Sequence, residues 1–224
     1  MDYRLIKAAL IDMDGPLYDS MPNHARAWKR VMDTVGVDAT EDEFFLYEGQ
    51  TGAKTIDLMI RRAFGRPATD QEKHDLYAMK AKFFVEQPPV EVMPGAIELV
   101  KLLRNHGIDT VLVTGSGQNS LLSRLDSDFP GAFPPEKRIT SASVTHGKPH
   151  PEPYLKGLAL AGVCPEEAIV IDNAPLGTAS GHAAGIYTIG VVTGPVPRAE
   201  LEGNGADIVY NSMAECAETL SRLL

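Results

Sequence analysis

Two carboxylates and a glycine follow the first apolar run of the chain, where they could bind a metal ion and attack a substrate. Asp12-Met13-Asp14-Gly15 comes directly after residues 5–11. Because side chains alternate along a strand, Asp12 and Asp14 point to one side and Met13 to the other. Two like charges this close repel each other unless a cation or a shared proton lies between them. Divalent cations such as Mg²⁺ take oxygen ligands, so the pair predicts metal-assisted chemistry; a simple turn at a strand end is the alternative.

Other residues that can bind phosphate or metal follow later segments of the chain. They are Thr114-Gly115-Ser116 after the apolar residues 111–113, Lys148 in a loop with prolines at 149, 151 and 153, and Asp172-Asn173 after residues 169–171. A hydroxyl and backbone amides at a strand end can hold a phosphoryl oxygen, and a stiff loop can hold a lysine as a fixed positive charge. Considered alone, the segment Thr114-Gly115-Ser116 is also typical of a local turn, and Lys148 is also typical of a solvated surface charge.

In chain order, these four segments resemble the motifs of the haloacid dehalogenase superfamily of phosphate-transfer enzymes. Residues 12–20 resemble the nucleophile loop of that family, and residues 111–116 resemble its hydroxyl motif. Residues 147–154 resemble its lysine motif, and residues 169–177 lie where the family carries an acidic pair. The resemblance covers the whole length of the chain.

The resemblance implies a role for each residue in the transfer of a phosphoryl group. Asp12 would attack phosphorus and form an aspartyl-phosphate, which divides one difficult displacement into two easier ones. Asp14 would protonate the leaving oxygen and then take a proton from the attacking water. The phosphate would be bound by Thr114, Gly115, Ser116 and Lys148.

The expected cofactor is Mg²⁺, and the chain departs from the family pattern near its site. The expected ligands are Asp12, the backbone carbonyl of Asp14, Asn173 and, through water, Asp172. Asn173 takes the position whose side chain normally binds Mg²⁺ directly; its amide oxygen is an acceptable ligand but carries no charge. Pro16 stands where the family usually has Thr or Val, and it removes one backbone donor.

Short apolar runs predict the strands that position these residues. The runs are rich in Val, Ile and Leu, as buried parallel strands are, and they cover residues 5–11, 110–113, 168–171, 187–192 and 207–210. Helical patterns alternate with the later strands, each opening near a proline and followed by a glycine; they cover residues 94–106, 151–161 and 175–184. The alternation predicts an α/β fold with a doubly wound parallel sheet, which is the Rossmann-like core that the resemblance implies.

Residues 20–90 break this alternation and show helical patterns alone, at 25–35, 51–64 and 70–85. About 70 residues are too many for a connection, so this segment is expected to fold on itself. It resembles the α-helical cap of the phosphoglucomutase-like branch. We therefore predict a core domain of residues 1–19 and 91–224 with an inserted cap of residues 20–90, crossing near 18–22 and 87–93.

The cap loop at residues 47–52 is expected to choose the substrate. Phosphohexomutases carry a lysine and an arginine in this loop, whereas this chain has Glu48 and Gly52 at those places. The loop instead resembles a bacterial branch assigned as inorganic pyrophosphatase, in which the cap glutamate helps to organise metal around a small substrate. A solvated acid at a helix end is the alternative for Glu48.

Two further cap residues are candidates for contact with the leaving group. His24 matches a histidine near the hinge in the mutase branch, and Lys80 on the third cap helix would meet the leaving phosphate. A packing histidine and an ordinary exposed lysine of a helix are the alternatives.

The leading hypothesis is a Mg²⁺-dependent phosphohydrolase with inorganic pyrophosphate as the favoured substrate. A sugar-phosphate phosphatase comes second. A β-phosphoglucomutase comes third, because both cap cations are missing. A non-catalytic phosphate-binding protein is kept open by Asn173 and Pro16.

Composition limits the expected partners and location. The 224 residues are 44% hydrophobic and 23% charged, which is ordinary for a globular protein. A net charge of −9 disfavours nucleic acid, whose phosphates need a basic surface. No apolar stretch approaches the roughly 18 residues of a membrane span, no signal region precedes the first motif, and Cys164 and Cys216 are too few for a disulfide framework. We expect a cytoplasmic monomer or weak homo-oligomer with a small phosphorylated substrate and no membrane partner.

Overall fold

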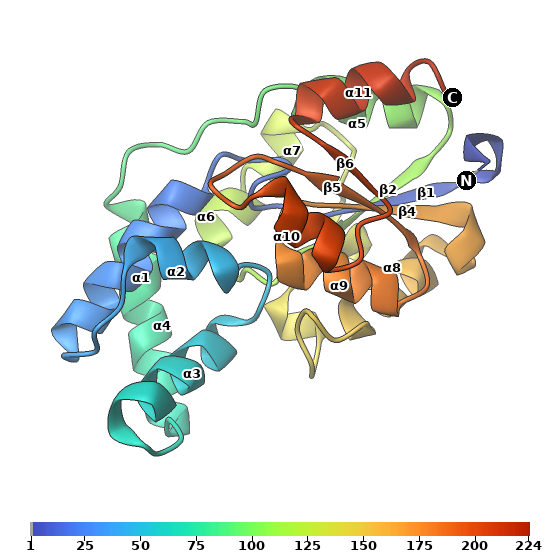
Figure 1. Cartoon of the computed structure of the whole chain (residues 1–224). Coiled ribbons are helices and arrows are strands. Elements are labelled where there is room, and N and C mark those ends of the chain that lie inside the picture. Colours follow the sequence, from blue (N-terminus) through green and yellow to red (C-terminus); the bar gives the residue numbers. More distant parts are fainter. Residues whose placement is uncertain (1) are drawn as a thin grey trace.

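Six parallel strands with helices on both faces form the larger part of the molecule, and a group of helices lies beyond the sheet (Figure 1). The computed structural model describes residues 2–224. The strands lie in the order β3-β2-β1-β4-β5-β6. They are β1 (Ala8–Ile11), β2 (Asp109–Val113), β3 (Arg138–Ile139), β4 (Ala168–Asp172), β5 (Tyr187–Val191) and β6 (Ile208–Tyr210). The chain winds outward from β1 in both directions, so the predicted doubly wound α/β fold is confirmed, and the switch point lies between β1 and β4, where such folds bind ligands.

The central strands are buried on both faces. Ala9 and Ile11 of β1 pack in one apolar cluster, whereas Ala8 and Leu10 pack in another on the opposite face. One face is covered by α5 (Ala96–Asn105) and α11 (Met213–Leu220), and the other by α8 (Glu152–Ala161), α9 (Pro175–Ala183) and α10 (Arg198–Gly203), as Figure 1 shows. Short helices complete the core at α6 (Asn119–Leu122), α7 (Leu125–Asp128), η1 (Tyr3–Leu5), η2 (Pro135–Lys137), η3 (Ser141–Ser143) and η4 (Pro165–Glu167).

Two details of the strand prediction are wrong. The first strand begins at Ala8 and not at residue 5, because Tyr3–Leu5 forms a 3₁₀ turn in which Asp2 caps the backbone amide of Arg4. The two-residue strand β3 was not predicted. It is too short to show an apolar pattern of its own and exists because it pairs with the edge of β2.

The segment predicted to form the cap contains four helices, whose apolar side chains form a cluster of their own. They are α1 (Met21–Thr34), α2 (Glu41–Leu46), α3 (Gly52–Phe64) and α4 (Asp70–Val85). Helix α1 begins four residues before the predicted start, with Pro22 in its first turn. Helix α2 was not predicted, although Thr40 and Glu43 form a capping box at its start. The separate cluster supports the division into core and cap, whose boundaries stay a prediction.

Two adjacent segments join the helical group to the core. Tyr18 pairs antiparallel with Val92, and the amide of Asp19 donates to the carbonyl of Glu91 at 3.0 Å. The two segments thus pair with each other and form a two-stranded connection at the place where the sequence predicts the chain to cross between core and cap.

The structure also bears on two expectations drawn from composition, the lack of a membrane span and the lack of a disulfide framework. Across residues 2–224, no helix has the length and apolar character needed to span a bilayer. Cys164 is exposed and Cys216 is buried, and both are free thiols.

Candidate active site

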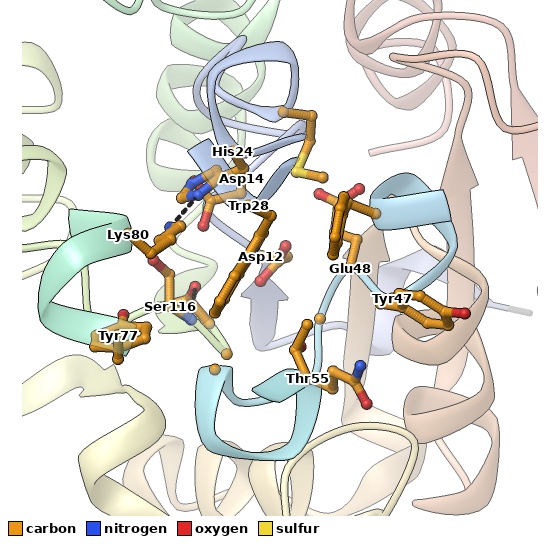
Figure 2. Close-up of a pocket in the computed structure, with 17 residues that line it drawn as sticks. Asp12, Asp14, His24, Trp28, Tyr47, Glu48, Thr55, Tyr77, Lys80 and Ser116 are labelled. Carbon is orange, nitrogen blue, oxygen red and sulfur yellow. Dashed lines mark hydrogen bonds and ion pairs between the residues drawn. The ribbon is translucent and has the colours of Figure 1, made fainter. Parts of the chain in front are cut away.

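A cavity of about 60 Å³ lies where the cap helices meet the carboxyl ends of the strands (Figure 2). Of the predicted site residues, those that line it are Asp12, Asp14, His24, Glu48, Lys80, Thr114, Gly115 and Ser116. Lys148, Asp172 and Asn173 do not line it and lie behind this wall. Since one water molecule needs about 10–15 Å³ of such a volume, the cavity as it stands has room for a few water molecules.

A buried row of charges runs behind the cavity wall from Asp12 to Asp172. Lys148 Nζ donates to Asp12 Oδ1 at 2.9 Å and to Asp172 Oδ2 at 2.7 Å, and all three side chains are at most 2% exposed. Burial alone would lower the pKa of Lys148, but the charges of Asp12 and Asp172 outweigh it and raise that pKa. Lys148 is therefore a fixed buried cation, and the interpretation as a solvated surface charge is wrong.

The carboxylate of Asp12 is held at the end of β1 under strong desolvation. Its backbone amide donates to the carbonyl of Ile171 at 3.0 Å, which extends the pairing of β1 with β4 by one residue. Burial raises the pKa of Asp12 to about 7 against the attraction of Lys148, and the charges of Asp172 and Asp14 add to this rise. Added positive charge, such as that of a bound cation, would lower this pKa and favour the ionised Asp12 that can attack.

Asp172 is occupied by protein partners on both of its oxygens. Oδ2 accepts from Lys148 and from the hydroxyl of Tyr154 at 2.5 Å, and Oδ1 accepts from the amide of Ala174 at 3.0 Å. A Cβ at Gly177 would lie 2.0 Å from this carboxylate, so glycine is needed there. The geometry makes Asp172 the anchor of Lys148.

Asp14 belongs to a second network, which crosses into the cap (Figure 2). Its Oδ1 accepts from Ser20 Oγ at 2.6 Å and contacts His24 Nε2 at 2.9 Å. The other ring nitrogen of His24 lies 2.5 Å from Lys80 Nζ. A cationic Lys80 donates to Nδ1 and leaves Nε2–H to donate to Asp14. Burial would raise the pKa of Asp14, but His24 and Ser20 together lower it.

Lys80 is 2% exposed, so the interpretation as an ordinary exposed lysine is wrong. Its Nζ lies 5.1 Å from the ring centroid of Phe84, 5.6 Å from that of Trp28 and 5.9 Å from that of Tyr77. Burial lowers the pKa of Lys80 to about 7, and Asp14 opposes that shift. His24 also packs on Phe84 at 4.4 Å between ring centroids, so it has both the packing role and the polar role.

The predicted phosphate-binding loop follows β2 and is covered by the cap. The amide of Ser116 donates to Thr114 Oγ1 at 3.0 Å. A Cβ at Gly115 would lie 2.3 Å from the carbonyl oxygen of Gly49, so the cap loop approaches the phosphate loop closely only because residue 115 is glycine. The amide of Gly117 also donates to the hydroxyl of Tyr77 at 3.0 Å, which attaches α4 to this loop.

Glu48 reaches from the cap loop to the end of β4. Its two carboxylate oxygens each accept from Asn173 Nδ2 at 3.2 Å, and the residue is 7% exposed. Burial raises the pKa of Glu48 well above its usual value, and the charges of Asp12, Asp14 and Asp172 add to that rise. The interpretation as a solvated acid at a helix end is therefore wrong.

The residues present fit a Mg²⁺ ion. Within residues 2–224, Asn173 Oδ1 is buried and has no hydrogen-bond partner. Gly15 has φ +99°, and a Cβ there would lie 2.1 Å from Asn173 Nδ2, so glycine is needed for this close approach. An unpaired amide oxygen, with the carboxylates of Asp12 and Glu48 close by, is the all-oxygen donor set that Mg²⁺ prefers.

Three residues of these networks were not predicted as site residues. Ser20 and Tyr154 lie inside the nucleophile and lysine segments, so their position within those motifs was the available signal. Tyr77 lies on α4, and no local pattern marked it.

The chain resembles known phosphate-transfer proteins over nearly its whole length. Residues 6–185 match the haloacid dehalogenase-like hydrolase family. Hexitol phosphatase A of Escherichia coli (strain K12) is 32% identical over 215 residues, covering 95% of this chain and 94% of that protein. Beta-phosphoglucomutase of Bacillus subtilis (strain 168) is 25% identical over 197 residues, covering 84% of each. The solved structure "Putative beta-phosphoglucomutase from Bacteroides vulgatus" superposes with a TM-score of 0.93 at 44% identity, covering 97% of this chain and 88% of that chain.

Proposed function

The chain belongs to the haloacid dehalogenase-like hydrolases, in their branch of β-phosphoglucomutases and sugar phosphatases, and we propose that it hydrolyses the phosphate ester of a small sugar or sugar alcohol. The observation that carries the proposal is the pair Asp12 and Asp14, which line the same cavity and each have their own buried partners. The name of hexitol phosphatase A supports this class of substrate. The pyrophosphatase branch expected from the cap loop finds no support among these relatives.

The first half of the reaction transfers the phosphoryl group to Asp12. A carboxylate oxygen of Asp12 attacks phosphorus, and the bond from phosphorus to the sugar oxygen breaks. The leaving oxygen takes a proton from Asp14. Lys80 and His24 stand behind Asp14 with hydrogen bonds already formed, so a proton can pass from His24 to Asp14 and from Lys80 to His24. The pKa of Lys80, about 7, suits such a donor near neutral pH.

The second half of the reaction releases phosphate. Water gives a proton to Asp14 while its oxygen attacks phosphorus, and the bond from phosphorus to Asp12 breaks. Both hydrogen bonds to Asp14 go to Oδ1, so Oδ2 is left to face the reacting group. Thr114, Gly115 and Ser116 would hold the phosphoryl oxygens, and Lys148 would offset their charge across the wall.

The chain's own residues also define where Mg²⁺ would bind. Asp12, the backbone carbonyl of Asp14 and Asn173 would hold it, with Glu48 within reach and Asp172 one step further away. When bound, the ion supplies positive charge to the phosphoryl oxygens.

Inorganic pyrophosphate is a second candidate, favoured by one observation. Glu48 and the small volume of the cavity leave little room for an organic group. A mutase is disfavoured, because Lys80 is the one Lys or Arg among the described residues that line the cavity. Lys80 is hydrogen-bonded to His24, so it is not available to bind a second phosphate group.

A substrate panel on one Mg²⁺-loaded preparation tests the proposal. We expect kcat/KM for hexitol and hexose phosphates to exceed that for pyrophosphate, with phosphate released and no isomeric sugar phosphate formed from β-glucose 1-phosphate. Preference for pyrophosphate would transfer the assignment to the second candidate. Formation of glucose 6-phosphate would indicate a mutase, and no turnover of any substrate would indicate a binding protein.

A further inference from the structure

A second group of potential metal ligands lies on the core, outside the cavity. His146, His150 and Glu152 each offer one donor atom, and these three atoms lie within 4.8 Å of one another. His146 Nδ1 is 3.1 Å from Glu152 Oε2, and the ring centroids of the two histidines are 4.7 Å apart. Both histidines are exposed, so an ion can reach them from solvent without movement of the cap. We propose that these three side chains bind a divalent transition-metal ion of the Zn²⁺ type, separately from the Mg²⁺ site.

Glu152 is already oriented and charged as a ligand needs to be. Its Oε1 accepts from the amide of Thr145 at 2.9 Å and from Lys156 Nζ at 2.9 Å. Its Oε2 accepts from the amide of His146 at 2.8 Å. These hydrogen bonds hold the pKa of Glu152 below its usual range, and the bond from Lys156 has the largest effect. Hydrogen bonds of this kind fix the direction of a ligating carboxylate in metal sites.

The donor set selects the class of metal. Two imidazole nitrogens and one carboxylate oxygen suit Zn²⁺, and after it Ni²⁺ or Cu²⁺. Mg²⁺ prefers oxygen donors alone, so it competes poorly here. Three protein ligands leave a fourth tetrahedral position for water. Bonds of about 2.0–2.2 Å require the donors to draw closer, which rotation of two exposed imidazoles permits.

Binding of the ion breaks existing hydrogen bonds, and this limits its affinity. The ion replaces the contact of His146 with Glu152 and the bond from the Glu152 amide to His150 Nδ1, which is 3.1 Å long. The affinity is therefore lower than that of a closed structural zinc site. Both histidines flank Lys148 in the chain, so the ion would occupy the outer side of the loop whose inner side presents Lys148 to Asp12.

Titration of the full chain with Zn²⁺ in excess Mg²⁺ tests the inference by calorimetry, because Mg²⁺ then fills the cavity site. We expect one Zn²⁺ per chain. His146→Ala and His150→Ala should each raise the dissociation constant by at least about 10-fold, the loss that removal of a supporting partner alone produces. His74→Ala, at an exposed histidine of α4, is the matched control and should bind Zn²⁺ as the wild type does.

Three results would overturn the site. They are no Zn²⁺ binding in excess Mg²⁺, equal binding by all three histidine variants, and loss of binding in Asp12→Asn with retention in the histidine variants. The last would place the ion in the cavity. Melting temperatures of the variants exclude a folding defect, since both side chains are exposed. The measurement needs no turnover, so it stands whether or not the proposed phosphatase activity is found.

Discussion

The core side and the cap side of the cavity hold their charges in different ways. On the core side, Lys148 lies between Asp12 and Asp172 and each contact joins opposite charges. On the cap side, Glu48 faces carboxylates and has one amide for a partner, while Lys80 has an imidazole and aromatic rings. Burial therefore raises the pKa of Glu48 and lowers that of Lys80.

This difference suggests a division of work. Each charge of the core row contacts an opposite charge before any ligand arrives, so these residues are expected to serve every substrate equally. Glu48 and Lys80 of the cap directly contact only an amide, an imidazole and aromatic rings, so their free energy depends on the metal ion or anionic group that enters. Substitutions in the core should then reduce turnover of all substrates in parallel, whereas substitutions in the cap should change the ratio between substrates.

The largest effect is expected for Asp12→Asn. The amide removes the attacking charge, so kcat should fall by roughly 10⁴-fold or more on every substrate, as for loss of other nucleophiles. Steady-state kinetics with sugar phosphates and pyrophosphate measures this. Asp19→Asn, an exposed aspartate on the same segment, is the control and should keep full activity. Near wild-type rates in the Asp12 variant would remove the covalent step.

Lys148→Met should destabilise the fold as well as stop turnover. It leaves Asp12 and Asp172 buried without their cation, a change that costs about 3–5 kcal/mol in other proteins. Urea unfolding near pH 7.5 measures the loss. The ordinary pKa of an aspartate is 3.8, and that of buried Asp12 is about 7 already and rises further in the variant.

The sign of the pH dependence follows from these values. Between pH 4 and the raised pKa, the folded variant binds a proton that the unfolded chain does not, so its stability falls as pH rises. Acid should therefore restore part of the loss. Because wild-type Asp12 takes up the same proton near pH 7, the gap to the wild type should narrow mainly as the pH falls from about 9 to about 7. A constant gap would mean that lost packing, and not unbalanced charge, causes the destabilisation.

Glu48→Ala tests the cap side directly. If Glu48 shapes a cavity for a small metal-bound substrate, pyrophosphate turnover should fall by roughly 10²-fold, as for loss of a positioned catalytic group. Turnover of a hexose phosphate should fall far less or rise, since the change removes bulk and charge. Asp42→Ala, at an exposed acid of α2, is the control. Parallel losses on both substrates would assign Glu48 to cap closure and end the proposed division of work.

The smallest effect is expected for Asn173→Asp. If Asn173 Oδ1 is a Mg²⁺ ligand, the added charge should tighten Mg²⁺ binding by about 10-fold, which corresponds to about 1.4 kcal/mol. Titration of Mg²⁺ by calorimetry measures it, with Asn105→Asp at an exposed position as control. Unchanged or weaker binding would remove Asn173 from the ligand set, and chelation should abolish activity in either case.

Sequence alone determined which residues stand at the ends of β1, β2 and β4. Continuous apolar runs and the places where they end are local properties, so Asp12, Thr114 and Asp172 could be placed at one edge of a parallel sheet before any contact was known. Helix α2 and strand β3 escaped prediction because such short elements depend on their neighbours more than on their own pattern.

Tertiary structure decided which of these residues are partners. Asp12 meets Lys148 across 136 positions, Glu48 meets Asn173 across 125 and His24 meets Lys80 across 56. No local pattern encodes such pairs, because they depend on how the cap helices dock on the sheet. Docking also determines burial, and burial is what makes the loop residue Glu48 and the helix residue Lys80 charges that respond to a ligand.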